Sequence, residues 1–179
     1  RGASSSGTWS ACLELLRART FAEAAVPLAA PVTISGRVYS DGSALCPTDA
    51  LFSRAAWAVS GPGAPYAPLA AQRVYGKQTV GRAELSALVW LTHCSGDFSI
   101  CTDCLYLQQR FTLLNTQPMP SKWTEGVNGD LGRLVRRTEI AVSWIRSNIP
   151  RDEVLMSGFT WADWLGNQAA DLACGSLAA

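Results

Sequence analysis

The 179-residue sequence predicts an α/β domain in which helices flank a mixed five-stranded sheet. Three strand-like segments follow one another from Val32 onward with short connections, which is typical of an antiparallel meander. Helical and strand-like segments then alternate, so the fourth and fifth strands are expected to run parallel in the same sheet. The hydrophobic content of 48% and the charged content of 16% indicate a folded globular chain rather than a disordered one.

The predicted meander occupies the first part of the domain. Its three strands are expected at 33–40, 55–60 and 66–75. The first strand is expected to end at a turn formed by Asp41-Gly42-Ser43, because Asp-Gly is a common turn dipeptide. Glycine and proline at 61–63 mark the end of the second strand.

Helical periodicity begins after the meander. Leu85, Leu88 and Leu91 recur at the spacing of one helix face, which predicts a helix over 80–94. Apolar residues at similar spacing predict that the longest helix spans 131–147. The other expected elements are a strand at 98–102, a helix at 105–114, a loop at 115–126, a strand at 154–159 and a helix at 165–174.

The first thirty residues are expected to form a segment separate from the folded domain, which spans 31–179. Residues 1–7 are small and polar, and Thr8 can cap a short helix. Pro27 and Pro31 are typical of a linker. Because the chain begins at Arg1 rather than at a methionine, we expect it to be part of a longer polypeptide.

Composition excludes some classes of partner and site. No apolar run approaches the roughly 20 residues needed to cross a bilayer, so no membrane partner is expected. The six cysteines are scattered, which favours reduced thiols and an intracellular location, nuclear or cytoplasmic. Cys101 and Cys104 have the spacing of a zinc or redox pair, but no second Cys or His pair completes such a site.

Four acidic residues lie in separate sequence contexts that suggest a shared divalent-metal site. Asp41 and Asp103 each follow an expected strand, and the carboxyl ends of neighbouring parallel strands lie side by side. Glu84 shares an apolar helix face with Leu88, where a carboxylate costs several kcal/mol unless it is compensated. Alone, Glu84 could be a helix acid favoured by the dipole, and Asp171 an ordinary helix acid. Their joint occurrence favours metal binding.

Four motifs occur in order along the chain and carry a resemblance to a known family. They are Asp41-Gly42-Ser43, TVGRAEL at 79–85, Asp103, and GNQAAD at 166–171. From about Val32 to Gly175 the sequence resembles the ribonuclease H family of type 1, including the ribonuclease H domains attached to reverse transcriptases of retroelements. The family carries a D-G-S turn, a T-x-N-R-x-E-L helix start, an aspartate after the fourth strand and a final G-N-E-x-A-D helix.

The resemblance implies an endoribonuclease that hydrolyses the RNA strand of RNA–DNA hybrids with two Mg²⁺ ions, or with Mn²⁺. Asp41 would bind both ions, Glu84 and Asp103 would complete one site, and Asp171 the other. The resemblance also implies that the hybrid is recognised by its shape and backbone. The residues that would contact it are Gly42, Ser43, Thr79, Arg82 and Asn167.

Three departures from the family pattern leave an alternative open. Trp161 stands where the family carries a histidine, five positions before the Gly of the G-N motif, and tryptophan cannot transfer a proton. Gly81 replaces the family's asparagine, and no lysine-rich handle occurs between 108 and 126. The alternative is a catalytically impaired module that binds or tethers nucleic acid within a larger retroelement protein. A DNA nuclease of the transposase, integrase or resolvase kind is disfavoured by the GNQAAD helix.

Overall fold

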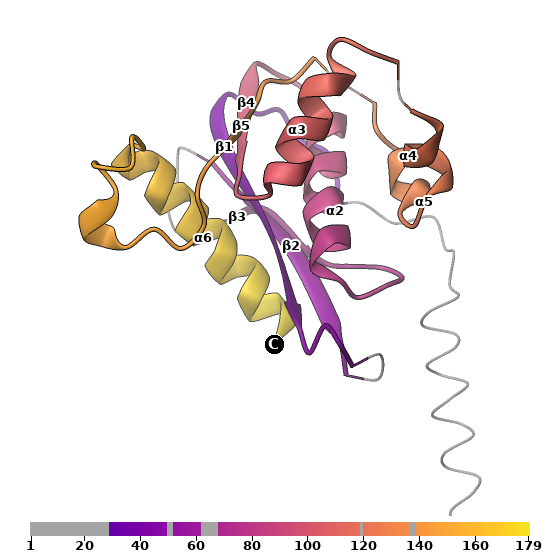
Figure 1. Cartoon of the computed structure of the whole chain (residues 1–179), viewed down its shortest axis with the longest axis horizontal. Helices are drawn as coiled ribbons and strands as arrows, with labels where there is room; N and C mark the ends of the chain where they lie inside the picture. The colour runs from indigo at the N-terminus through magenta and orange to yellow at the C-terminus, as the bar shows by residue number, and fades with distance from the viewer. Residues whose placement is uncertain (1–28, 50–51, 62–67, 119, 137–138) are drawn as a thin grey trace, which may run out of the picture.

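The computed structural model describes residues 29–49, 52–61, 68–118, 120–136 and 139–179. They form one sheet with helices on both of its faces (Figure 1). The tail and short helix expected within residues 1–28 lie outside the described residues. Among the described helices, none has the length and apolar character needed to span a bilayer.

The sheet has five strands in the order β3-β2-β1-β4-β5. β1 pairs antiparallel with β2, and β2 pairs antiparallel with β3, whereas β4 runs parallel to both β1 and β5. This arrangement confirms the mixed sheet predicted from the sequence. The strands are β1 (Gly36–Leu45), β2 (Arg54–Ser60), β3 (Pro68–Arg73), β4 (Phe98–Thr102) and β5 (Val142–Trp144).

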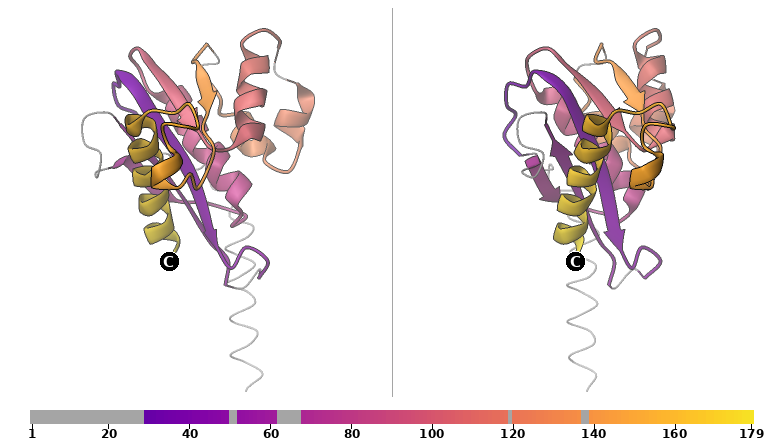
Figure 2. Two further views of the ribbon diagram at one scale, coloured as in Figure 1. Left: turned by 60° about the vertical axis from the view of Figure 1, so that its left-hand side comes forward. Right: turned by 90° about the vertical axis from the view of Figure 1, so that its left-hand side faces the viewer.

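The helices divide between the two faces of the sheet. Figure 2 shows α6 on one side and α2 on the other, and both pack against β1 and β2. A 3-10 helix spans Arg151–Glu153. The helices are α2 (Val80–His93), α3 (Leu105–Leu114), α4 (Ser121–Glu125), α5 (Gly129–Gly132) and α6 (Trp161–Ala178).

Successive side chains of β1 point to opposite faces of the sheet, so they belong to two different clusters of apolar side chains. Val38 belongs to the main core between the sheet and α2, where the rings of Trp57 and Trp90 lie 5.7 Å apart. Tyr39 belongs to a smaller cluster with Cys101 beside the start of α6. Burial of these side chains stabilises the packing of both helices against the sheet.

The first strand does not end where the sequence predicts. β1 continues through Asp41 and Gly42, which pair with Ala58 and Trp57 of β2, so the expected turn at 41–43 is wrong. Asp41 therefore lies within the strand rather than at its carboxyl end. Pairing with β2 satisfies the backbone groups that a turn would have used, and this tertiary interaction overrides the local turn preference of Asp-Gly.

The segment after α3 differs most from the prediction. The helix expected at 131–147 is replaced by the short α5 and by β5, and the strand expected at 154–159 is absent from this described segment. Part of the loop expected at 115–126 forms α4. The apolar spacing of 134–145 fits a helix as well as a strand, and the exposed edge of β4 decides the outcome by pairing with Val142–Trp144.

Candidate active site

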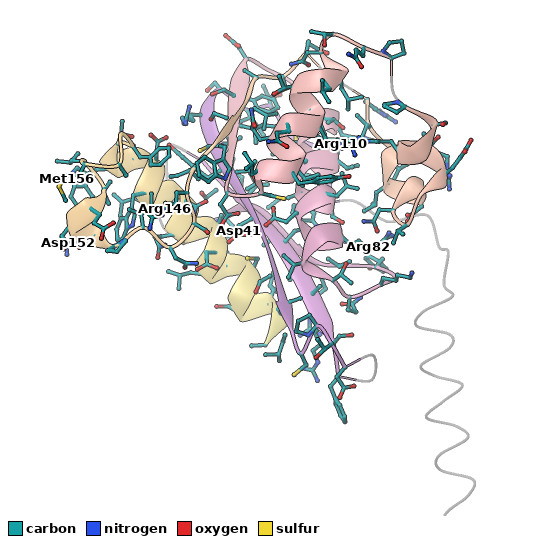
Figure 3. All side chains as sticks on the ribbon, viewed as in Figure 1. Asp41, Arg82, Arg110, Arg146, Asp152 and Met156 are labelled. Carbon is teal, nitrogen blue, oxygen red and sulfur yellow. The ribbon has the colours of Figure 1, made fainter. Side chains whose placement is uncertain are left out.

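The four acidic residues singled out from the sequence line a single cavity of about 380 Å³. Asp41 comes from β1, Glu84 from α2 and Asp171 from α6, whereas Asp103 directly follows β4. In Figure 3, Asp41 lies near the centre of the molecule between α6 and the other helices. The cavity therefore lies where elements from both faces of the sheet meet.

Strand register places Asp41 beside Asp103. Ser40 of β1 pairs with Thr102 of the parallel strand β4, so the residues that follow them also lie side by side. β4 ends at this point while β1 continues, so Asp103 lies just beyond the carboxyl end of β4. The predicted neighbourhood is present, although only Asp103 follows the end of its strand.

Gly42 allows α2 to approach the sheet closely enough to bring Glu84 to Asp41. A Cβ atom at Gly42 would lie 2.4 Å from the backbone nitrogen of Glu84, which no side chain could tolerate without movement. The Gly42 N–H donates to Asp41 Oδ1 at 2.7 Å and to Glu84 Oε1 at 3.0 Å. One backbone group thus orients both carboxylates, and this N–H points inward instead of toward a substrate.

The possible ligand atoms form two overlapping groups. In what we call the all-oxygen group, those of Asp41, Glu84 and Asp103 lie within 4.8 Å of one another. In what we call the mixed group, those of Asp41, Asp171 and Cys174 do so as well. Asp41 belongs to both groups.

The all-oxygen group fits a hard divalent cation such as Mg²⁺ or Mn²⁺. Glu84 is only 4% exposed, and its Oε2 atom has no hydrogen-bond partner among the described residues. A buried carboxylate oxygen without a partner is costly, and a bound cation would remove that cost. The donor chemistry and this buried oxygen therefore both suit a metal ion.

Burial and repulsion from neighbouring carboxylates raise the pKa values of Asp41, Glu84 and Asp103. Burial raises the pKa of Asp41, to which the charge of Asp171 adds. The pKa of Glu84 lies well above its ordinary value because of burial and then the charges of Asp41 and Asp103. Burial, followed by the same kind of repulsion from Asp41, raises the pKa of Asp103 to about 7. Without a cation, the cluster therefore retains protons at pH values where isolated carboxyl groups lose them.

Cys174 lies beside Asp41 and Asp171 without lining the cavity, and the motifs did not point to it. Its side chain is fully buried, and its thiol donates a hydrogen bond to the backbone oxygen of Asp171 at 3.2 Å. Burial, more than the neighbouring carboxylates, raises the pKa of this thiol. The sequence could have pointed to Cys174, because it follows Asp171 by three residues and residues at that spacing are neighbours on one face of a helix.

Only some of the substrate-binding residues that the resemblance implies line the cavity. Gly42 and Asn167 line the cavity, whereas Ser43 and Thr79 do not. Thr79 is exposed and caps α2, its hydroxyl accepting a hydrogen bond from the Arg82 backbone N–H at 3.3 Å. Asn167 is only 5% exposed, and its Oδ1 atom has no hydrogen-bond partner within the described part of the chain.

Arg82 is not among the residues that line the cavity. Its buried guanidinium forms an ion pair with Asp130, and its Nε donates to the backbone oxygen of Tyr75 at 2.6 Å. Figure 3 shows it away from Asp41, toward the side of the molecule that carries α5. The side chain links α2 to α5 and to the preceding loop, and the expectation that Arg82 contacts substrate stays a prediction.

Trp161 also lies outside the set of residues that line the cavity. Its ring packs edge-on against Trp164 at 5.8 Å, and Arg151 lies over it at 5.8 Å. The loop after β5 instead contributes Ser147 and Asn148, neither of which was singled out from the sequence. Ser147 belonged to the helix wrongly expected at 131–147, and Asn148 directly follows that range. Asn148 adopts a left-handed conformation with φ of 53°, which asparagine tolerates better than most residues.

Comparison with known proteins supports the architecture. No protein-family model and no curated protein matches the sequence. Among solved structures, the protease-reverse transcriptase of prototype foamy virus is 18% identical with a TM-score of 0.51, and the match covers 88% of this chain and 22% of that chain. The foamy virus ribonuclease H domain is 14% identical with a TM-score of 0.49, and the match covers 80% and 96% of the respective chains.

The match to the protease-reverse transcriptase spans about a fifth of that longer chain. At this identity the likeness concerns the fold. The strand order β3-β2-β1-β4-β5, with α2 and α6 on opposite faces, agrees with it. The chain therefore has a ribonuclease H-like fold.

Proposed function

We propose that this chain is a metal-dependent endoribonuclease that hydrolyses the RNA strand of RNA–DNA hybrids. The observation that carries the proposal is the position of Asp41, which lines the cavity with the three other acidic residues and belongs to two groups of possible ligand atoms. A carboxylate shared between two such groups suits a pair of divalent ions. The ribonuclease H-like fold favours the hybrid as substrate.

Each carboxylate has a proposed task. Asp41 would hold both ions, Glu84 and Asp103 would complete the all-oxygen site, and Asp171 would complete the other. When bound, the two ions supply an activated water and stabilise the charge on the leaving oxygen. The Gly42 N–H fixes one oxygen of Glu84, which leaves its unpartnered oxygen for the cation. Asp103 would give up its proton on binding, because its pKa of about 7 belongs to the metal-free cluster.

Substrate contacts are proposed for groups that remain available at or near the cavity. Asn167 lines it with an unpartnered amide oxygen, which suits a hydroxyl or a bound water. Gly81 also lines the cavity, and apart from its chain neighbours and the backbone of its own helix no atom lies within 4 Å of where its Cβ would be. The missing asparagine side chain therefore leaves room beside the carboxylates. Ser43 and exposed Thr79 remain candidates for contacts with backbone phosphates outside the cavity.

Cleavage of a strand-labelled RNA–DNA hybrid with Mg²⁺ or Mn²⁺ tests the proposal. The wild type is compared with Asp103→Asn and with Asp152→Asn, a matched control at an exposed aspartate outside the cavity. We expect cleavage of the RNA strand by the wild type and by Asp152→Asn, and its loss in Asp103→Asn. Duplex RNA and duplex DNA serve as substrate controls.

Two results would contradict the proposal. Folded wild type that binds the hybrid but yields no product with either metal would leave the binding or tethering module as the better account. Cleavage of duplex DNA would instead indicate a DNA nuclease with the same fold.

A further inference from the structure

One turn near the start of α6 is held tightly against the sheet. Gly166 of this turn packs on the ring of Tyr39, and a Cβ atom at Gly166 would lie 2.1 Å from the Cδ2 atom of that ring. The hydroxyl of Ser60, which is fully buried, donates a hydrogen bond to the Gly166 backbone oxygen at 2.6 Å. Tyr39 and Ser60 are paired neighbours on β1 and β2, so one place on the sheet carries both contacts.

Charged and polar groups hold the same end of α6. The Tyr39 hydroxyl donates to Asp163 Oδ1 at 3.3 Å, and Arg37 of β1 forms an ion pair with Asp163 at 2.6 Å. Asp163 also forms a capping box with Thr160, which satisfies backbone groups in the first turn of the helix. Several contacts therefore fix the start of α6 to β1, and the absence of a side chain at Gly166 sets how closely the helix can approach.

The held turn lies close to two of the carboxylates. Asp41 follows Tyr39 by two residues on the same side of β1, a separation of about 7 Å. Asp171 follows Gly166 by five residues, which is about 7.5 Å along the axis of α6. Ligand atoms of Asp41 and Asp171 lie within 4.8 Å of one another, and α6 runs beside β1 over this length (Figure 2). A shift of α6 at Gly166 therefore changes the distance between the two carboxylates.

We infer that Gly166 and Ser60 are positioning residues, which set the place of Asp171 relative to Asp41 and so the affinity of this pair for a divalent ion. Neither residue lines the cavity, so both act through the position of α6 and not by touching an ion or a substrate. The inference rests on the proposed function, in which Asp41 and Asp171 complete one of the two metal sites.

Binding of Mn²⁺ to the metal-free protein tests the inference without any activity measurement. Electron paramagnetic resonance follows the free ion, and Asp171→Asn identifies the part of the binding that depends on this carboxylate. We compare Gly166→Ala with Gly175→Ala, a matched control on the same helix. Apart from chain neighbours and the helix backbone, no atom lies within 4 Å of where the Gly175 Cβ would be.

Gly166→Ala should weaken the Mn²⁺ binding that depends on Asp171 by at least about tenfold, the scale seen on losing a group that orients a metal ligand. Gly175→Ala should leave this binding unchanged, because α6 does not have to move. Circular dichroism and thermal unfolding establish that each variant is folded. Equal Mn²⁺ affinity in folded Gly166→Ala and Gly175→Ala, or Mn²⁺ binding that does not change in Asp171→Asn, would overturn the inference.

Ser60→Ala is a milder change, which tests the inference even if Gly166→Ala does not fold. Its control is Ser86→Ala, because Ser86 is also buried and donates to a backbone oxygen at 2.8 Å, but within one helix. Both variants lose one buried hydrogen bond, so similar losses of stability are expected. Only Ser60→Ala should weaken the Mn²⁺ binding that depends on Asp171. Equal affinity in the two folded serine variants would contradict the role of Ser60.

Hybrid cleavage at increasing Mg²⁺ concentration provides the second measurement. In Gly166→Ala and Ser60→Ala, the Mg²⁺ concentration that gives half of the maximal rate should rise, while KM for the hybrid stays near the wild-type value. A purely structural defect would lower the rate equally at every Mg²⁺ concentration. Weaker Mn²⁺ binding in Gly166→Ala without cleavage by the wild type would support the positioning role and remove the proposed hydrolysis. Cleavage by the wild type with equal Mn²⁺ affinity in all four variants would do the reverse.

Discussion

The all-oxygen group and the mixed group share Asp41 but differ in how deeply their other residues are buried and in the ligand atoms that they offer. In the all-oxygen group, Glu84 is buried and held by Gly42, and its second oxygen has no protein partner among the described residues. In the mixed group, Asp171 is exposed at the surface of α6 and its neighbour Cys174 is a neutral thiol when buried. The first arrangement is fixed by packing and is costly without a cation. In the second, Asp171 has access to solvent, whereas Cys174 is fully buried.

The largest expected effect comes from Asp41, the residue that belongs to both sides. Asp41→Asn should reduce the rate of hybrid cleavage by about 10²- to 10³-fold, which corresponds to about 3 to 4 kcal/mol of lost transition-state stabilisation. Asp171→Asn removes a ligand from one side only and should cost less. Single-turnover rates at saturating metal measure both effects. An equal or greater loss in Asp171→Asn would contradict the shared role of Asp41.

Metal binding should stabilise the fold mainly through the all-oxygen group. At a Mg²⁺ concentration about 100 times its dissociation constant, mass action contributes about 2.7 kcal/mol, which raises the Tm of a domain of this size by about 5 to 10 °C. Glu84→Gln should lose most of this shift. Thermal unfolding with and without Mg²⁺ measures it, and exposed Glu125→Gln is the control. A shift that survives in Glu84→Gln would place the main metal site elsewhere.

The pH dependence of stability in the metal-free protein should have an unusual sign. Asp103 has a folded-state pKa of about 7, above the value of about 4 expected in the unfolded chain, and the pKa of Glu84 is also raised. The folded protein therefore retains protons that the unfolded chain releases, and its stability falls as pH rises from about 4 to about 7.

Asp103→Asn removes one source of this pH dependence. After allowance for solvent screening of a partly exposed group, we expect Asp103 to account for about 1 to 2 kcal/mol of the change. Urea unfolding with a chelator across this pH range measures the slope in the wild type and in the variant. Stability that rises with pH in the wild type, or an unchanged slope in Asp103→Asn, would show that the carboxylates do not repel one another as the geometry implies.

The smallest expected effect distinguishes Asn148, in the loop after β5, from Trp161, the first residue of α6. Asn148 lines the cavity and Trp161 does not, so Asn148→Ala should lower the cleavage rate by up to about tenfold, or about 1.4 kcal/mol. Trp161→Ala should change the rate per folded molecule much less, although loss of its packing against Trp164 lowers stability. Rates are compared after thermal unfolding has established the folded fraction. A larger loss of rate in Trp161→Ala than in Asn148→Ala would indicate that Trp161 contributes to catalysis.

Local patterns predicted those elements whose own residues determine them. The strand at Phe98–Thr102 and the helix at Leu105–Leu114 occur with the expected bounds, and α2 ends within one residue of its expected end. Each combines a clear apolar period with a boundary signal, so little depends on distant partners. β5 was mistaken for a helix because Val142–Trp144 becomes a strand only by pairing with β4.

The sequence by itself determined the chemical character of the site. Four acidic motifs identified the carboxylates, and the order of strands and helices identified the sheet that carries them. Tertiary packing decided which partners the side chains around these carboxylates contact. Arg82 turns to Asp130, Cys174 faces Asp41, and Asn148 reaches the cavity, because α5, α6 and the loop after β5 each meet residues that are distant in sequence. Motifs record which groups are present, whereas their direction follows from contacts that exist only in the folded chain.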